Sequence, residues 1–209
     1  MTGVAAIRTA PLAEFHRRRK EGSRERLLAA ATEAFCAQGY FPVSVEDIAS
    51  AAGVSRMTFY RHFSGKVAIA GEIFHQNAED AMPRYLAIGQ RDYLDHAVVA
   101  DWIRSLFEAD AASRQLLRVF IQAYAESSDF SESARTIFGE LIAELGKCIP
   151  AFALDSDNPQ QRRRWLEAWL LFYEMLYQSN AAARGSGVST DPLIIEILAD
   201  RFLTFVKAA

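Results

Sequence analysis

Glycine and proline are scarce in this sequence, with 11 and 6 copies among 209 residues. Both residues interrupt regular structure, and a fold of many short strands needs them at its turns. Hydrophobic residues make up 51% of the chain, enough for one large core or for a small domain and a larger one. The composition therefore favours long helices over a many-turned β fold.

Cysteines and long apolar runs are equally rare. Cys36 and Cys148 stand far apart and fit neither a metal nor a redox spacing. They indicate small core residues in a reducing compartment. No run approaches the roughly 18 apolar residues of a membrane span, and the basic N-terminal run follows an apolar start, the reverse of a signal peptide. We therefore expect a cytoplasmic protein with no membrane partner.

Enzyme signatures are also missing. The sequence has no phosphate-binding loop, Gly-x-Ser-x-Gly elbow or zinc spacing. Glu72 and His75 form one Glu-x-x-His, half of a di-iron motif, and no other histidine follows a glutamate at this spacing. We expect no catalytic residue, no metal and no cofactor. A di-iron enzyme remains the alternative, and stoichiometric iron or manganese would revive it.

The charge of the chain is unevenly distributed. Residues 1–66 carry ten Lys and Arg against six Asp and Glu, a net of +4, whereas the remainder carries 13 against 20, a net of −7. A basic end on an acidic body suits a protein that binds a polyanion at one end. Residues 1–22 end in a basic run at 16–20 and show no apolar periodicity, which predicts a flexible arm. This arm is either a plain tail or a segment that contacts DNA.

Two short helices joined by a tight turn are predicted between residues 44 and 63, after a helix over 23–38. Capping residues mark both starts, a glycine marks the turn, and apolar residues at helical spacing mark the buried faces. These positions are Ser44 with Asp47, Gly53, Ser55, and Phe59 with Phe63. The pattern is typical of a helix-turn-helix.

The exposed face of the second helix favours DNA over an ordinary helical hairpin. It carries no carboxylate between Ser55 and Phe63, whereas a plain surface helix mixes both signs of charge. A major groove about 12 Å wide admits one such helix, and side chains near its N-terminus reach base edges.

The block from Ser23 to about Ile73 resembles the DNA-binding domain of the tetracycline-repressor (TetR) family of bacterial regulators. The resemblance rests on fixed residue types at fixed spacing, namely Ala34, Phe35, Gly39, Tyr40, Val45, Ile48, Ala49, Ala52, Gly53, Val54, Ser55, Thr58, Phe59, Tyr60, His62, Phe63 and Lys66. It implies an all-α fold: an arm over 1–22, a three-helix helix-turn-helix domain over 23–66, and a helical-bundle domain over 67–209 that binds a ligand and dimerises.

The resemblance also implies a function and contacts. It implies a sequence-specific transcriptional regulator, a repressor released from its operator by a small apolar or aromatic ligand. The implied base contacts are Arg56, Met57 and Arg61, and the implied phosphate contacts are Ser44, Thr58, Tyr60, His62 and Lys66. The chemistry agrees, because hydroxyls and an ammonium position a protein on the backbone while arginine reads guanine. A non-specific architectural DNA binder is the alternative, and the acidic body counts against it.

The remaining chain predicts further amphipathic helices near 66–82, 96–108, 113–126, 131–149, 159–183 and 192–207. The helix at 159–183 is apolar nearly all round and must be buried on more than one side. The resemblance implies that the last two helices form a homodimer on a palindromic operator, and their extra apolar surface suits this, with a monomeric core as the alternative. Seven aromatic residues are candidates for the pocket of an unknown effector, although any single one also fits plain core: Trp102, Phe107, Phe120, Tyr124, Phe138, Trp169 and Tyr173.

Overall fold

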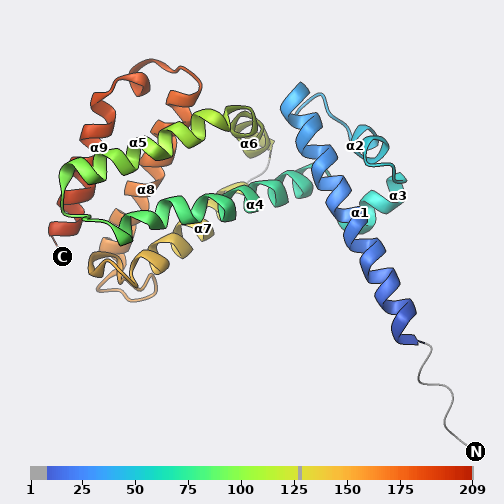
Figure 1. Ribbon diagram of the computed structural model, residues 1–209, viewed down its shortest axis with the longest axis horizontal. Helices are drawn as coiled ribbons and strands as arrows, with labels where there is room; N and C mark the ends of the chain where they lie inside the picture. The colour runs from blue at the N-terminus through green and yellow to red at the C-terminus, as the bar shows by residue number, and fades with distance from the viewer. Residues whose placement is uncertain (1–8, 127–128, 209) are drawn as a thin grey trace, which may run out of the picture. The chain divides into compact units, whose positions relative to one another are not determined.

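The structure is a computed structural model that describes residues 9–126 and 129–208, with side chains at all of these except 9–20, 124 and 129–135. Every regular element in the described ranges is a helix, so the predicted all-α class is confirmed (Figure 1). None of these helices is long and apolar enough to cross a membrane. The chain divides into two compact units, Met1–Ile73 and Phe74–Ala209. The division falls inside α4 (Lys66–Leu86), later than the expected boundary after residue 66.

The first unit contains α1 (Thr9–Gln38), α2 (Val45–Ala51), α3 (Arg56–His62) and the start of α4. Its core comes from every one of these helices, and its largest fully buried side chains are Leu27, Phe35, Tyr40, Ile48, Phe59 and Ile69. Gly39, directly after α1, has a positive φ of 86° and ends that helix, because glycine takes this conformation without strain.

Helix α1 corrects the expected arm over 1–22, because it begins at Thr9 rather than near Ser23. Good helix formers fill this segment, and Pro11 lies in the first turn, where its missing N–H does not interrupt the helix. The lack of an apolar stripe does not exclude a helix here, because extending a helix that has already formed adds one hydrogen bond per residue without any burial. The side chains at 16–20 lie outside the described residues, and their contact with DNA stays a prediction.

The second unit contains the rest of α4 and the helices that follow it. These are the 3-10 turn η1 (Ala87–Gln90), α5 (His96–Ala112), α6 (Arg114–Glu126), α7 (Asp129–Leu145), η2 (Pro150–Phe152), α8 (Arg162–Ala183), η3 (Gly187–Thr190) and α9 (Leu193–Lys207). Helices α5, α8 and α9 pack against one another (Figure 1). Phe152 stacks on Phe205 at 4.8 Å between ring centroids and contacts Phe172 and Phe202.

Helix α4 runs through Pro83 to Leu86, although the sequence predicted an end at Met82. A proline in a helix removes one N–H donor and favours a bend. The turn beyond it is held by packing, because Tyr85 and Leu86 lie against the core of the second unit. The carbonyl of Arg84 also accepts a hydrogen bond of 2.9 Å from the buried indole Nε1 of Trp102.

Gly146 is required where the chain leaves α7. A Cβ there would lie 2.6 Å from the carbonyl oxygen of Phe152 and 2.9 Å from Cα of Ala153, both backbone atoms. We expect Gly146→Ala to lower the free energy of unfolding by about 1–3 kcal/mol, because the backbone must shift. Gly71→Ala is the control: nothing lies within 4 Å of its added Cβ in α4. It should raise stability by about 0.5–1 kcal/mol. Urea unfolding followed by circular dichroism measures both, and equal effects of the two variants would contradict the argument.

Candidate DNA-binding surface and ligand cavity

Local hydrogen bonds fix both short helices of the first unit. The N–H of Asp47 donates to the Ser44 hydroxyl at 3.1 Å, and the N–H of Ser44 donates to the Asp47 carboxylate at 2.9 Å, so the predicted capping box is confirmed. Gly53 has a φ of +63°, which permits the tight turn. The Ser55 hydroxyl then accepts from the N–H of Thr58 at 3.1 Å and caps α3. The two helices thus form the predicted helix-turn-helix.

Helix α3 has one buried face and one exposed face, as its spacing predicted. Phe59 and Phe63 are buried, with ring centroids 5.9 Å apart. Met57 is 83% exposed and Tyr60 is 46% exposed. Arg61 is also exposed, and no described side chain pairs with it. This face is therefore open to a partner outside the unit.

Arg56 is already paired within the first unit. Its guanidinium lies 2.7 Å from the Glu46 carboxylate of α2 and donates to the Tyr60 hydroxyl at 3.4 Å. The side chain also lies over the Tyr60 ring, 5.5 Å from the centroid. The Tyr60 hydrogen bond and the Glu46 charge raise the pKa of Arg56, which stays cationic. A partner that takes up Arg56 must therefore compete with Glu46.

The residues expected to contact phosphate are not equally free. The Ser44 hydroxyl is engaged by Asp47, and its hydrogen bonds lower the pKa of that carboxyl. The Thr58 hydroxyl lies 3.0 Å from that of Ser55. The Lys66 ammonium donates to the carbonyls of Tyr40 at 3.1 Å and Phe41 at 3.2 Å, and it lies 4.3 Å from the centre of the Tyr40 ring. Lys66 thus ties the loop after α1 to the start of α4, and His62 is half-buried.

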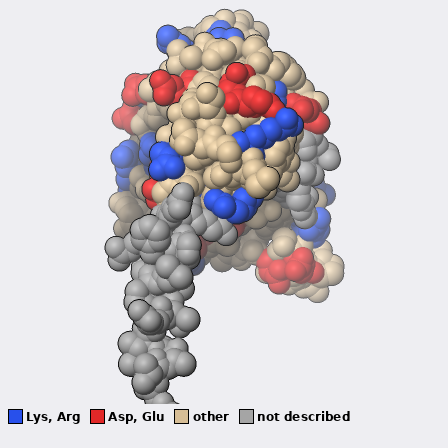
Figure 2. Space-filling model, turned by 90° about the vertical axis from the view of Figure 1, so that its right-hand side faces the viewer, with Lys and Arg blue, Asp and Glu red and all other residues tan. Residues whose placement is uncertain are grey.

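Charges of both signs share this part of the molecule. Figure 2 shows Lys and Arg side chains interspersed with Asp and Glu side chains on the face that it displays. Glu46 and Asp47, in the first turn of α2, are both exposed. Among the described residues on this face, basic side chains therefore stand beside acidic ones and form no single uninterrupted patch.

The half-motif of a di-iron site is used for other contacts. Glu72 lies 2.5 Å from the Arg24 guanidinium, and His75 lies 3.9 Å from Glu79. Across the part of the chain that the structure describes, no three His, Cys, Asp or Glu side chains gather as a metal site.

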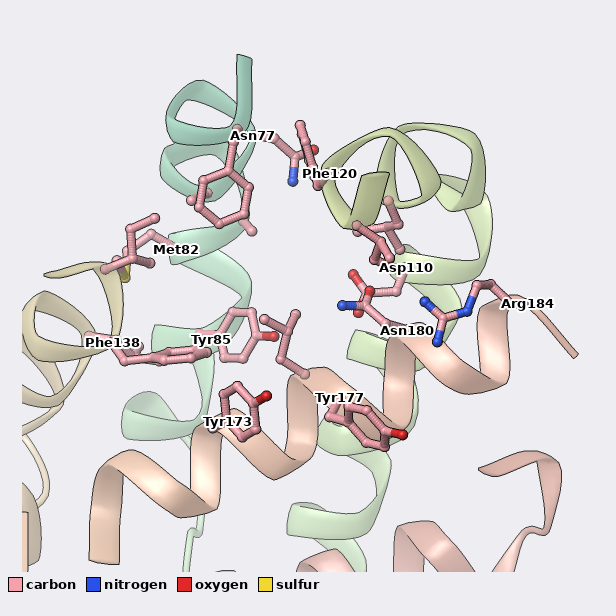
Figure 3. A pocket seen from close by; sticks show the side chains of 18 residues that line it. Asn77, Met82, Tyr85, Asp110, Phe120, Phe138, Tyr173, Tyr177, Asn180 and Arg184 are labelled. Carbon is pink, nitrogen blue, oxygen red and sulfur yellow. The ribbon is translucent and has the colours of Figure 1, made fainter. Parts of the chain in front are cut away.

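A cavity of about 360 Å³ lies within the second unit (Figure 3). Its volume falls within the range of about 300–1,000 Å³ typical of small-molecule sites. Helices α4, α5, α6, α7 and α8 all contribute to its wall. The lining residues are Phe74, Asn77, Ala78, Ala81, Met82, Tyr85, Asp110, Leu117, Phe120, Ile121, Ile137, Phe138, Leu141, Tyr173, Leu176, Tyr177, Asn180 and Arg184.

Only part of the expected aromatic set lines this cavity. Phe120, Phe138 and Tyr173 do so. The others in the described part of the chain serve the core: Trp102 is fully buried, Phe107 packs against the same core, and Trp169 lies behind the wall, stacked 5.1 Å from Tyr173 and 5.9 Å from Phe138. The side chain of Tyr124 lies outside the described residues. Helical spacing marks a buried face without distinguishing a filled interior from a hollow one.

Among the described residues that line the cavity, Asp110 is the one carboxylate. It accepts a hydrogen bond from the buried Ser179 hydroxyl of α8. Burial raises the pKa of Asp110, and this effect outweighs Ser179 and the charge of Arg84, which lower it. Burial and the charge of Asp110 also raise the pKa of Tyr85, whose phenol stays protonated.

Sequence reasoning missed most polar residues of the cavity. On α8 and its C-cap they follow one stripe, Tyr173, Tyr177, Asn180 and Arg184, at spacings of four, three and four residues. On α4, Asn77 and Tyr85 share a face with Ala81. Asparagine within apolar helices was the usable signal, because a buried amide needs hydrogen-bonding partners.

Helices α8 and α9 also expose large apolar side chains. On α8, Leu166, Leu170 and Tyr177 are exposed, and on α9, Leu193 and Ile197 are exposed. We name these five residues the apolar α8/α9 surface. Single exposed apolar residues are ordinary, but a run at helical spacing on two packed helices is typical of an interaction surface.

Comparison with known proteins identifies the family of the helix-turn-helix. Residues 27–73 match the family model for bacterial regulatory proteins of the tetR family. The chain is 31% identical over 120 residues to the HTH-type transcriptional activator FasR of Mycolicibacterium smegmatis, covering 57% of this chain and 47% of FasR. It is 29% identical over 147 residues to the HTH-type transcriptional repressor KstR2 of Rhodococcus jostii, covering 70% of this chain and 63% of KstR2. The chain thus spans about half to two thirds of these curated relatives.

The fold agrees with this match. The crystal structure of Thermus thermophilus FadR, a TetR family transcriptional repressor in complex with lauroyl-CoA, superimposes with a TM-score of 0.56 at 26% identity. The superposition covers 88% of this chain and 93% of that one. The resemblance inferred from residues 23–73 is confirmed: the helix-turn-helix domain of this chain, residues 27–73, belongs to the tetR family of bacterial regulatory proteins.

Proposed function

We propose that this chain is a sequence-specific, ligand-responsive transcriptional regulator that binds a palindromic operator as a homodimer. The observation that carries the proposal is the exposed face of α3, which presents Met57, Tyr60 and Arg61 from a rigid helix-turn-helix. A recognition helix of this kind enters the major groove, where arginine reads guanine and an apolar side chain contacts the thymine methyl.

The proposed contacts divide by role. Arg56, Met57 and Arg61 read bases, and Ser44, Thr58, Tyr60, His62 and Lys66 position the protein on phosphates. Arg61 is the strongest candidate for base reading, since it is exposed and no described side chain occupies it. To contact DNA, Arg56 must leave its ion pair with Glu46 and bind a base edge or a phosphate instead. The Glu46 carboxylate repels phosphates, which works against a purely architectural, non-specific binder.

The proposed homodimer forms through α8 and α9. A palindromic site requires two copies of α3 related by twofold symmetry. The apolar α8/α9 surface supports such pairing, because Leu166, Leu170 and Ile197 would leave water on association.

The proposed effector is a small molecule in the cavity of the second unit, and its binding releases the regulator from its operator as in a repressor. FadR of Thermus thermophilus is a repressor described with a bound lauroyl-CoA, which supports ligand control in a relative. Helix α4 supplies a route, since Ile69 and Ile73 are buried in the first unit while Met82 and Tyr85 line the cavity. The ligand acts only through unequal affinity for the two states of the protein.

Selection of bound sequences from random duplex DNA tests this function. We expect a palindromic winner that the full chain binds about 10³-fold or more tighter than scrambled DNA. Binding at two salt concentrations separates the phosphate contribution from base reading. Failure to enrich any sequence, with or without candidate effectors, would contradict the proposed function.

Two neighbouring substitutions test the division of roles on α3. Arg61→Ala should weaken binding to the selected duplex by about 1–3 kcal/mol and relax specificity at one base position. Tyr60→Phe removes only a hydroxyl and should weaken all sequences alike. Fluorescence anisotropy on the selected duplex and its single-base variants measures both effects. Identical losses for the two proteins on every sequence would show that Arg61 does not read a base.

A further inference from the structure

The polar end of the cavity offers acceptors that lack donors. Asp110 and Asn180 lie on the same side of the cavity (Figure 3). Among the described residues, only Ser179 donates to Asp110, at Oδ2, which leaves Oδ1 free. The Asn180 Oδ1 is buried and accepts no hydrogen bond from any described residue. A buried acceptor without a donor is unfavourable, so a ligand that donates here gains affinity.

The groups around Asp110 define the charge that this end accepts. Helix α8 contributes Ser179 and Asn180, and helix α4 contributes Arg84 and Tyr85. Arg184 also lines the cavity, but its side chain is exposed to water, which screens its attraction for an anion. A ligand carboxylate beside Asp110 would place a second acidic group at a site where burial already disfavours ionisation, so one of the two would have to take up a proton.

The rest of the wall determines the frame of the ligand. Away from this end, the lining is formed mainly by aromatic and aliphatic side chains of α4, α6 and α7, including Phe120 and Phe138, with the amide of Asn77 beside Phe120 (Figure 3). Such walls bind apolar surface, while a few polar groups fix the orientation of the molecule.

We propose that the effector is an apolar, ring-sized molecule with a hydroxyl or ammonium group that donates to Asp110 and Asn180, and that the cavity discriminates against carboxylates. This inference rests on the proposed ligand-responsive function and specifies the chemistry of its effector. The recognition works by negative as well as positive selection, since the buried carboxyl that attracts a donor repels an acid.

Calorimetric titration of the full chain with matched probes tests the proposal. The probes share a propylbenzene frame and carry a hydroxyl (4-propylphenol), an ammonium (4-propylbenzylamine), a methyl ether without a donor (4-propylanisole) or a carboxylate (4-propylbenzoate). The same four groups on naphthalene form a second series. We expect the phenol or the amine to bind roughly 10- to 100-fold tighter than the ether, and the carboxylate to bind most weakly. Whichever of the two donors binds tighter identifies the group of the effector.

Asp110→Asn separates the charge from the shape of the site. It should abolish the preference of the donor probes over the carboxylate, whereas Asp101→Asn, an exposed carboxylate on the same helix, should leave that preference unchanged. The melting temperature of Asp110→Asn should not fall near pH 7, because burial disfavours the ionised form of this carboxyl and the replacing amide is neutral. A carboxylate that binds as tightly as the donors, an unchanged preference in Asp110→Asn, or no binding of any donor probe would each overturn the proposal.

DNA binding distinguishes a failure of the proposed function from a failure of the proposed effector chemistry. Without any ligand, Asp110→Asn should bind the selected duplex as the unaltered chain does, since Asp110 lies in the second unit and the helix-turn-helix in the first. If neither protein binds a specific duplex, the proposed regulator is wrong whatever the probes show. If both bind and the carboxylate probe is preferred, only the assignment of the effector is wrong.

Discussion

Phe59→Ala is expected to lower the free energy of unfolding of the first unit by about 3–5 kcal/mol and to abolish sequence-specific DNA binding. Phe59 is fully buried on the inner side of α3. The centroid of its ring lies 5.9 Å from that of Phe63 and 5.6 Å from that of Tyr60. The unit is small, and deleting this ring leaves a cavity beneath the helix that carries the proposed base contacts. With a total stability of about 5–15 kcal/mol for ordinary domains, such a loss is a large fraction.

The distribution of tryptophan allows the effect to be assigned to one unit. All three tryptophans, Trp102, Trp165 and Trp169, belong to the second unit, so their fluorescence reports only on that unit. Circular dichroism reports on helices of both. We expect Phe59→Ala to shift an early part of the dichroism melt and to leave the fluorescence melt in place. Met57→Ala is the control for stability, since this side chain is 83% exposed on the same helix. An unchanged dichroism melt in Phe59→Ala would contradict the assigned core.

Leu170→Glu is expected to weaken association of the proposed dimer by about 100-fold or more, because two carboxylates would be buried without partners across the twofold axis. Leu170 is 57% exposed in the isolated chain, so its replacement should leave the unfolding of that chain nearly unchanged. Affinity for a duplex with both half-sites should fall with dimerisation, whereas affinity for a single half-site should not. Sedimentation equilibrium and anisotropy on the two duplexes measure these effects.

Leu94→Glu is the matched comparison for that experiment. Leu94 is 51% exposed, close to the 57% of Leu170. It lies between η1 and α5, away from α8 and α9 in the sequence. It should leave both the sedimentation equilibrium and the binding of either duplex unchanged. Equal behaviour of the two glutamate variants would show that the apolar α8/α9 surface does not pair copies of the chain.

The helix-turn-helix was predictable nearly residue by residue. Its signals are local: a hydroxyl caps a helix, a glycine permits a positive φ, and two phenylalanines four residues apart face inward. Ser44, Gly53 and Ser55 do what their types and positions indicate. The predicted start of α1 and the predicted end of α4 were wrong, because the first depends on helix propagation and the second on packing. Tyr85 and Leu86 hold the turn after Pro83 through contacts that no short stretch of sequence records.

The cavity was predictable only in its general location. Trp102 and Phe120 look alike in the sequence, since each is an aromatic residue on an apolar stripe. Their difference arises from helices far apart in the chain: Trp102 meets Phe202 of α9 at 5.4 Å between ring centroids, whereas Phe120 meets Phe74 of α4 at 5.0 Å beside the cavity. Likewise, the engagement of Arg56 by Glu46 depends on how α2 and α3 cross.

Helix α8 carries two sets of requirements on its exposed side, and this limits how such a protein diversifies. Tyr177 belongs both to the cavity wall and to the apolar α8/α9 surface, and Leu170 lies on that surface two turns earlier. A substitution at Tyr177 that adapts the cavity to a new molecule would, under the proposed pairing, also alter the partner that each copy accepts. The lining residues Leu117 of α6 and Ile137 of α7 lie outside the apolar α8/α9 surface. New ligand preferences in a lineage of related proteins should therefore arise first on α6 and α7, with α8 following only when both copies change together.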